Sequence, residues 1–227
     1  LPGVEVALEG LLESDGLRVL ALFDKPDPLE GPYFEETIYV TPSRLPQTIQ
    51  RAVAATTQQA ATALGLRTGP VHAELRINEA GVWIVEIAGR SIGGLCSATL
   101  QFGPTNASLE ELVLRQAAGL PIESWEREHA ARGVLMIPIP TRGLLRGVHG
   151  VEAAEAVAGI ESIEITARLN YPVTPLPEGE SYLGFIFAHG DEPAHAERAL
   201  REAHALLEFE IEPEIGLIPV SRLQNEL

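Results

Sequence analysis

The chain has 227 residues, is 45% apolar and carries a formal charge of −16 at neutral pH. This length can bury a sizeable core in one large domain or two small ones, and the acidic charge argues against a basic surface for nucleic acid or an anionic membrane. The single cysteine, Cys96, excludes an internal disulfide and a cysteine-rich zinc site, and together with the absence of any apolar run of about 20 residues it favours a cytoplasmic protein.

The first 65 residues predict a hairpin, a short strand and a helix. Apolar residues alternate through residues 4–12, a turn follows, and residues 17–23 return as the second strand. Residues 36–40 predict a short strand, and residues 45–64 carry an apolar stripe at helical spacing. Lys25 precedes Pro26, which predicts a loop with a stiff backbone.

A second hairpin is predicted between residues 71 and 90, whose sequence is VHAELRINEAGVWIVEIAGR. A three-residue loop at residues 79–81, with a positive φ at Gly81, would pair Asn78 with Val82. The same register sets Glu74 opposite Glu86. It also places the apolar residues together on one face: Val71, Ala73, Leu75, Ile77, Trp83, Val85 and Ile87.

The opposed carboxylates are the main functional signal of this hairpin. The Cβ atoms of directly opposite residues lie about 5 Å apart, so Glu74 and Glu86 repel each other unless something positive separates them. A hard divalent cation such as Mg²⁺ is the natural candidate. The alternative is a solvated outer face, but Arg76 and Arg90 share the parity of the carboxylates, and the glycine turn at residues 91–94 would let backbone approach a ligand.

The remainder of the chain alternates between helices and strands. Ser108 begins a capping box for a helix that ends before Gly119. Asp191 is predicted to cap the final helix. The other predicted elements are a linker or short helix at 124–132, strands at 133–140, 162–169 and 182–188, and a helical turn at 151–157. This order predicts an α+β fold with a domain boundary near Arg132.

Four further candidate groups are less specific. Lys25 could reach a phosphate or a substrate carboxylate, although such a lysine is more often simply solvated. His72 could orient a substrate or a metal ligand, and a structural hydrogen bond explains it equally well. Cys96 has no paired base and is interpreted as a buried small hydrophobe. The last group is a small basic loop, formed by Arg142, Arg146 and His149, that could bind a substrate carboxylate.

The segment Glu86-Ile87-Ala88-Gly89-Arg90, with Glu74 before it, resembles the metal-binding signature of the ATP-grasp superfamily, Glu-x-Asn-x-Arg after an acidic ligand on the neighbouring strand. The resemblance implies that Glu74 and Glu86 bind the Mg²⁺, or Mn²⁺ in its place, that bridges ATP phosphates. It implies a catalytic Arg90 that stabilises the transferred phosphoryl group. Glu74, Glu86, Arg90 and Lys25 are therefore the expected ATP-binding residues. Ala88 departs from the pattern, which favours the amino-acid ligase branch and leaves one ligand to water or phosphate.

Two later segments extend the resemblance. Residues 108–122, SLEELVLRQAAGLPI, resemble the helix and Ala-Gly-x-Pro stop that follow the site in biotin carboxylase, and residues 170–190 resemble the closing segment of its C-terminal domain. The implied architecture is the C-terminal lobe of an ATP-grasp domain at residues 1–132, an antiparallel sheet with packed helices. A small biotin-carboxylase-like α+β subdomain follows at residues 133–227.

The implied function is part of an ADP-forming carboxylate–amine ligase, similar to L-amino acid ligases, that acts through an acyl phosphate. Its partners would be ATP, a small carboxylate and an amine, with a homodimer left open. The lid and the region before it are expected in cis or in trans, upstream of Leu1, so this chain alone is expected to bind ATP poorly and to be inactive. The alternatives are a biotin-carboxylase-like enzyme and a non-catalytic binding or scaffold piece.

Overall fold

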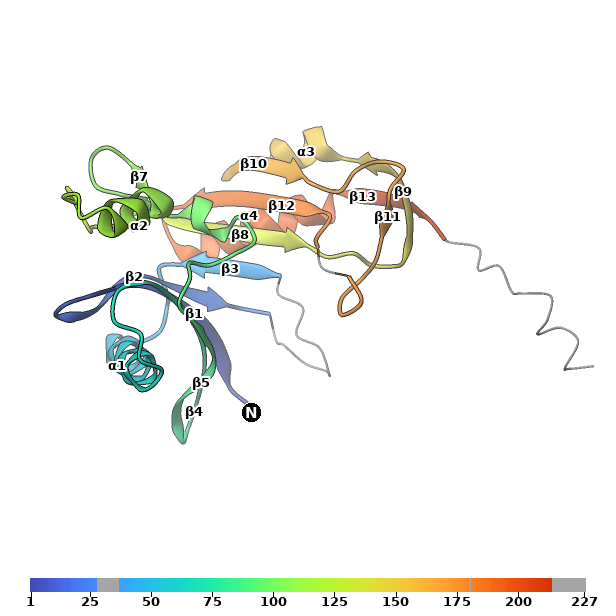
Figure 1. Cartoon of the computed structure of the whole chain (residues 1–227). Helices are drawn as coiled ribbons and strands as arrows, with labels where there is room; N and C mark the ends of the chain where they lie inside the picture. The colour runs from blue at the N-terminus through green and yellow to red at the C-terminus, as the bar shows by residue number, and fades with distance from the viewer. Residues whose placement is uncertain (28–36, 180, 214–227) are drawn as a thin grey trace, which may run out of the picture.

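The computed structural model describes residues 1–27, 37–179 and 181–213, and its core is one large sheet (Figure 1). The strands of this sheet are β1 (Val4–Glu13), β2 (Gly16–Lys25), β3 (Ile38–Thr41), β4 (Gly69–Asn78), β5 (Gly81–Ala88), β8 (Ala131–Ile137), β10 (Ile160–Ile165) and β12 (Gly184–Gly190). They lie in the order β10-β12-β8-β3-β2-β1-β4-β5, and every neighbouring pair is antiparallel. The predicted α+β class with an antiparallel sheet is confirmed.

Two small sheets and the helices complete the fold. One sheet has the order β11-β9-β13, formed by β11 (Pro172–Val173), β9 (Gly143–His149) and β13 (Glu208–Glu212), and the other pairs β6 (Gln101–Phe102) with β7 (Ala107–Ser108). The helices are α1 (Gln47–Ala63), the 3₁₀ helix η1 (Cys96–Thr99), α2 (Leu109–Ala117), α3 (Val151–Glu155) and α4 (Pro193–Ala205). None of the described helices is long and apolar enough to cross a membrane.

The alternation of side chains along the strands divides the core between the two faces of the large sheet. On one face, Val53 of α1 packs with Val6 and Leu75, and α4 packs farther along the sheet over β8 and β12. On the other face, Phe23 and Tyr39 pack with residues of η1 and α2. The polar end of this second face, beyond η1, is where the candidate site lies.

Most predicted elements are present, with corrections at their ends. Ser108 caps α2 as predicted, because its Oγ accepts a hydrogen bond from the backbone N–H of Glu111. The predicted cap of α4 is wrong: the N-cap residue is Glu192, and its side chain makes no capping bond. Residues 124–130 form no helix. Glu36, in the predicted strand at 36–40, lies outside the described residues.

The large sheet runs across the predicted domain boundary. Arg132 lies inside β8, which pairs on one side with β3 and on the other with β12. The division into residues 1–132 and 133–227 stays a prediction. Any two units divided there would share the main-chain hydrogen bonds of one sheet, so we expect them to unfold together.

The close packing of β8 against α4 gives a first test. A Cβ atom on Gly133 would lie 2.9 Å from Leu200 Cδ1 and 3.2 Å from Tyr39 O. Because this space is filled, we expect Gly133→Ala to lower the free energy of unfolding by about 1–3 kcal/mol in urea titrations. Gly93→Ala is the control, since its Cβ would meet nothing within 4 Å. An equal loss in both variants would contradict this account.

Candidate functional site

The β4–β5 hairpin sets Glu74 directly opposite Glu86, as the sequence predicts. The predicted three-residue loop, however, is wrong, although Gly81 has the predicted positive φ of 138°. Asn78 pairs with Gly81 rather than with Val82, so only two residues, 79 and 80, connect the strands. A turn shortened by one residue would, in a regular ladder, slip every following pair by one position.

A β-bulge restores the predicted pairing of the carboxylates. Leu75 pairs with Ile84, and the next pair along the ladder is Glu74 with Glu86, so Val85 is the extra residue on β5. A bulge of this kind inserts one residue into one strand and increases the local twist. The shortened turn and the bulge therefore cancel at Glu74, and the two carboxylates face each other.

The residues between the turn and the bulge have the opposite orientation to the prediction. Val82 and Ile84 pack into the core beneath α1, whereas Trp83 and Val85 are 45% and 46% exposed. The reason is the period of two along a strand, because a shift of one residue moves each side chain to the other face. As a result, Val85 lies on the same face as the carboxylates.

The polar face of the hairpin lines a cavity of about 540 Å³. The cavity brings together Glu74, Glu86 and Arg90, which are three of the four predicted site residues. The other lining residues come from β3, β4, β5, β8 and the segments beside η1 and β12: Tyr39, His72, Val85, Ser91, Ile92, Gly93, Gly94, Cys96, Met136 and Tyr182. Acidic, basic and apolar groups thus meet in one space.

Lys25, the fourth predicted residue, does not lie in a loop. It is the last residue of β2, it is buried, and it is not among the cavity-lining residues. Its Nζ lies 2.5 Å from Glu5 Oε1 and 3.3 Å from Glu74 Oε2, and it sits 5.2 Å from the centre of the Tyr39 ring. Lys25 therefore supports Glu74 from beneath the cavity.

Two further contacts hold the Glu74 carboxylate on the cavity side. Tyr39 Oη donates to Glu74 Oε1 at 3.2 Å, and His72 Nε2 lies 3.7 Å from the same oxygen. Glu5 in turn is held by Arg76, whose Nε lies 2.8 Å from Glu5 Oε2. Because a buried charge is tolerated only with matched partners, this arrangement fixes Glu74 in place.

Glu86 and Arg90 form the exposed side of the cavity. Their side chains are 57% and 56% exposed, and Arg90 Nη2 lies 3.5 Å from Glu86 Oε1. Arg90 Nη1 also donates to the backbone carbonyl of Ser91 at 3.0 Å. An ion pair this exposed is weak, so both side chains can turn toward a ligand at little cost.

His72 bridges the cavity to a buried carboxylate that the sequence reasoning missed. Its Nδ1 lies 3.2 Å from Glu9 Oε2, and Glu9 is fully buried. Burial alone would lower the pKa of His72, but its contacts with Glu74 and Glu9 outweigh burial and raise that pKa to about 9. The imidazole is therefore protonated at neutral pH and can donate from both nitrogens.

The sequence of their strand does not reveal that Glu5 and Glu9 are buried. Both have the parity of Ala7 and Leu11, which are buried under η1 and α2, so the face that carries them is not an exposed one. The alternation of Val6 and Leu8 with these glutamates reads as one apolar and one solvated face. A strand that is covered on both faces gives the same pattern when one face holds a buried ion network.

The described charges around Glu74 and Glu86 balance. The carboxylates and cations are Glu5, Glu9, Glu74 and Glu86 against Lys25, His72, Arg76 and Arg90. Within the described part of the chain, no group of three or more His, Cys, Asp or Glu side chains is arranged to hold a metal. Glu74 and Glu86 are the carboxylates among the described residues that line the cavity.

The predicted basic loop lies mostly in a strand, and its Arg146 is already paired. Arg146 and His149 lie in β9, where Arg146 Nε is 2.6 Å from Glu212 Oε2 and its Nη1 donates to Asn170 Oδ1 at 2.7 Å. Arg142 immediately precedes this strand. Figure 1 shows β9 at the opposite end of the molecule from β4 and β5, so this group is separate from the acidic hairpin.

Cys96 is buried, as predicted, at the wall of the cavity.

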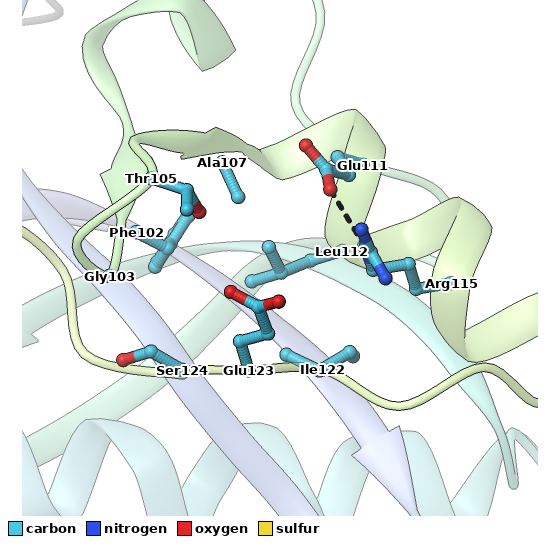
Figure 2. Close-up of a pocket in the computed structure, with 10 residues that line it drawn as sticks. All are labelled: Phe102, Gly103, Thr105, Ala107, Glu111, Leu112, Arg115, Ile122, Glu123 and Ser124. Carbon is cyan, nitrogen blue, oxygen red and sulfur yellow. Dashed lines mark hydrogen bonds and ion pairs between the residues drawn. The ribbon is translucent and has the colours of Figure 1, made fainter.

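A second cavity, of about 130 Å³, lies beside α2 (Figure 2). The ion pair between Arg115 Nε and Glu111 Oε1, at 2.7 Å, lies at the edge of this cavity, and the Glu123 carboxylate points into the cavity. None of the predicted site residues lines this cavity. We place the candidate site in the larger one, because only there do opposed carboxylates, an arginine and a glycine turn meet.

Comparison with known families identifies this arrangement. Residues 1–99 match the family model of the ATP-grasp domain, and residues 135–212 match that of L-amino acid ligase C-terminal domain 2. The chain belongs to the ATP-grasp superfamily. The ATP-grasp match contains the whole β4–β5 hairpin and the turn at residues 91–94, and the second match contains Met136 and Tyr182. Both matched regions therefore line the same cavity.

Solved structures agree with this assignment. The L-amino acid ligase from Bacillus licheniformis superposes with a TM-score of 0.77 and 27% identity, over 92% of this chain and 52% of that chain. The fold is also shared with N5-carboxyaminoimidazole ribonucleotide synthetase from Thermotoga maritima, with a TM-score of 0.69, 17% identity, and coverage of 92% and 53%. A third structure is the biotin carboxylase domain of 2-oxoglutarate carboxylase from Hydrogenobacter thermophilus. It has a TM-score of 0.66 and 14% identity over 92% of this chain and 46% of that chain.

This ATP-grasp chain spans about half the length of these solved structures. No curated protein matches its sequence. The chain is similar to the L-amino acid ligase in two respects: the 27% identity, and the match of residues 135–212 to the L-amino acid ligase C-terminal domain 2. The other two structures support the fold alone.

The charged state of His72 gives a test that needs no ligand. Its pKa is raised from 6.5 to about 9 in the folded chain, so the stabilisation is complete below pH 6.5 and is lost as pH rises through 9. We expect the free energy of unfolding to fall by up to about 3 kcal/mol over this range, and His72→Gln to remove most of this dependence. His149→Gln, at an exposed histidine, is the control and should leave the pH profile unchanged. A wild-type profile that is flat above pH 6.5 would contradict the raised pKa.

Proposed function

We propose that this chain is part of an ATP-dependent, ADP-forming carboxylate–amine ligase of the L-amino acid ligase type, which works in the cytoplasm through an acyl phosphate and requires Mg²⁺. The observation that carries the proposal is the pairing of Glu74 with Glu86 in one cavity with Arg90. The family matches of residues 1–99 and 135–212 support it.

The donor set fits a hard divalent cation. Glu74 and Glu86 present carboxylate oxygens from opposite strands, and oxygen is the ligand that Mg²⁺ prefers. Lys25 orients Glu74 from beneath the cavity and Tyr39 orients it from the cavity side, as ligand-supporting groups do at metal sites. When bound, Mg²⁺, or Mn²⁺ in its place, would neutralise phosphate charge on the nucleotide.

The charge balance predicts that the cation enters with the nucleotide. Because the described carboxylates and cations around Glu74 and Glu86 cancel, a lone divalent ion gains little net attraction there. A nucleotide brings negative phosphates that pair with Arg90 and with protonated His72, which both line the cavity. Those phosphates also supply the ligand position that Ala88 cannot fill.

The proposed reaction has two steps. An oxygen of the substrate carboxylate attacks the γ-phosphorus of ATP, ADP leaves, and an acyl phosphate forms. The nitrogen of the amine substrate then attacks the acyl carbon, inorganic phosphate leaves, and the nitrogen loses a proton as the amide forms. Arg90 stabilises the negative charge that develops on the transferred group, a role for which a planar, bidentate guanidinium is suited.

The apolar part of the cavity would receive the uncharged parts of the substrates. Val85 is placed there by the bulge, and Met136 and Tyr182 come from the region that matches the L-amino acid ligase domain. Because binding pockets combine a mostly apolar lining with a few polar groups, this division fits a small carboxylate with an apolar side chain.

A biotin-dependent carboxylase remains the second candidate, favoured by the fold shared with the biotin carboxylase domain. Residues 135–212 favour the ligase instead, since they match the L-amino acid ligase domain. Release of ADP that depends on an amino acid would support the ligase, whereas release that depends on biotin and bicarbonate would support the carboxylase. A third candidate, a non-catalytic piece, would release no ADP under either condition.

The metal assignment is tested at Glu86. We expect Glu86→Gln in the full-length protein to lower Mg²⁺-dependent ADP formation at least about a hundredfold, because a neutral amide binds the cation weakly and leaves nucleotide charge uncompensated. Thermal unfolding should be unchanged, since Glu86 is exposed. Glu79→Gln, in the turn of the same hairpin, is the control and should keep full activity. Normal turnover of Glu86→Gln would refute the metal site.

The role of Arg90 is tested by a substitution that keeps its charge. Lysine cannot offer two parallel N–H donors to one phosphoryl group. We therefore expect Arg90→Lys to lower kcat by about 10- to 100-fold, with a smaller change in the KM for ATP. Arg18→Lys, at an arginine paired with Glu13 outside the cavity, is the matched control. A change confined to KM would mean that Arg90 only binds the nucleotide.

A further inference from the structure

Glu9 is buried more completely than any other described carboxylate on the site face of the sheet. Its relative exposure is 0%, compared with 6% for Glu5. Burial raises the pKa of Glu9, and the hydrogen bond and charge of His72 act against that rise. A carboxylate in such a place is destabilising unless charged and polar partners hold it, so the contacts of Glu9 are the evidence for its role.

One oxygen of Glu9 holds two separate parts of the site. Oε2 accepts a hydrogen bond from the backbone N–H of Ile92 at 3.1 Å and lies 3.2 Å from His72 Nδ1. Ile92 belongs to the turn after β5, and His72 belongs to β4. The other oxygen, Oε1, has no hydrogen-bond partner among the described residues, so Oε2 alone joins three segments of the chain.

The turn that Ile92 belongs to is held at this point by the Ile92 side chain, which packs into the core, and by the bond of the Ile92 N–H to Glu9. Residues 91–93 follow β5 without regular secondary structure, so the Ile92 N–H bonds to a side chain instead of a neighbouring strand. Ser91, Ile92 and Gly93 all line the large cavity, directly after Arg90. The bond to Glu9 thus holds the backbone of this turn two residues after Arg90.

The second contact of Glu9 extends to the metal-binding carboxylate that we propose. His72 lies between Glu9 and Glu74, with its Nδ1 toward Glu9 and its Nε2 3.7 Å from Glu74 Oε1. Because both nitrogens of one rigid ring are involved, a change at Glu9 reaches Glu74 through the orientation of the imidazole. Glu9 thus connects the two sides of the cavity without lining it.

We propose that Glu9 is a positioning residue, which fixes the turn after Arg90 through the Ile92 N–H and fixes His72 against Glu74. The effect of Glu9 on catalysis rests on the proposed ligase function, whereas its effect on the turn is independent of any activity. Reacting groups must be held closely in an active site, and a displacement of about 1 Å can cost 10²-fold in rate.

Two substitutions separate positioning from general stability. Glu9→Leu removes both acceptor contacts and fills the buried space with an apolar side chain, but it leaves the buried His72 without one of its partners, so it is the more disruptive change. Glu9→Gln keeps one acceptor oxygen and nearly the same shape. Glu13→Gln is the matched control, because Glu13 lies on the same strand but pairs with Arg18 away from the cavity.

The first measurement is amide hydrogen exchange, with the ¹⁵N shifts of the His72 ring, on this chain. Loss of a bond to a charged acceptor should speed exchange at Ile92 about 10- to 100-fold in Glu9→Leu, and less in Glu9→Gln. The amides of β1 and β4 should remain protected. Unchanged protection at Ile92 in Glu9→Leu, or an equal loss throughout β1 and β4, would overturn the proposal. If Glu9→Leu does not fold, the same comparison is made with Glu9→Gln, where unchanged Ile92 exchange together with unchanged ring shifts overturns it.

The second measurement is ADP release by the full-length protein. We expect Glu9→Gln to lower kcat about tenfold or more while the KM for ATP changes little, because the nucleotide contacts remain and only their alignment is lost. A normal kcat would overturn the link to catalysis. If the wild-type protein releases no ADP with any amino acid, the proposed function fails, and the Ile92 exchange still decides whether Glu9 holds the turn.

Discussion

The buried charges of β1 are the constraint on which the site depends. Glu5 and Glu9 lie on the sheet face that η1 and α2 cover, with almost no exposure to solvent. Desolvation of each carboxylate costs several kcal/mol, which only matched cations offset. Those cations come from the two neighbouring strands, Lys25 from β2 and Arg76 and His72 from β4. The order β2-β1-β4 therefore determines the site, because it places Lys25 on one side of β1 and the two cations of β4 on the other.

This network explains why one carboxylate of the opposed pair is rigid and the other is exposed. Glu74 is held by Lys25 and Tyr39, and its side chain is 15% exposed. Glu86 faces it from the edge strand β5 with a side chain that is 57% exposed and a weak contact to Arg90. A fixed carboxylate beside an adaptable one suits the proposal that a cation arrives together with a nucleotide, because the adaptable side chain can close once the phosphates are present.

The two family regions meet at the cavity rather than at a linker. The ATP-grasp region supplies the carboxylates and Arg90, while Met136 on β8 and Tyr182 just before β12 come from the part that matches the L-amino acid ligase domain. Because β8 pairs directly with β3, the sheet itself brings these regions together. Phosphate chemistry and the apolar surface for substrates would thus be supplied by different parts of one sheet.

The sequence by itself determined the class of fold, the Ser108 cap and the pairing of Glu74 with Glu86, since local alternation and capping depend on residues close in the chain. The pairing is correct although the predicted turn is not, because the bulge at Val85 offsets the shortened turn, and bulges leave little trace in a pattern of period two. Tertiary structure alone decided that Lys25 is buried and that Glu9 meets Ile92, a residue 83 positions away. Contacts between such distant residues follow from strand order, which alternation along a single strand does not encode.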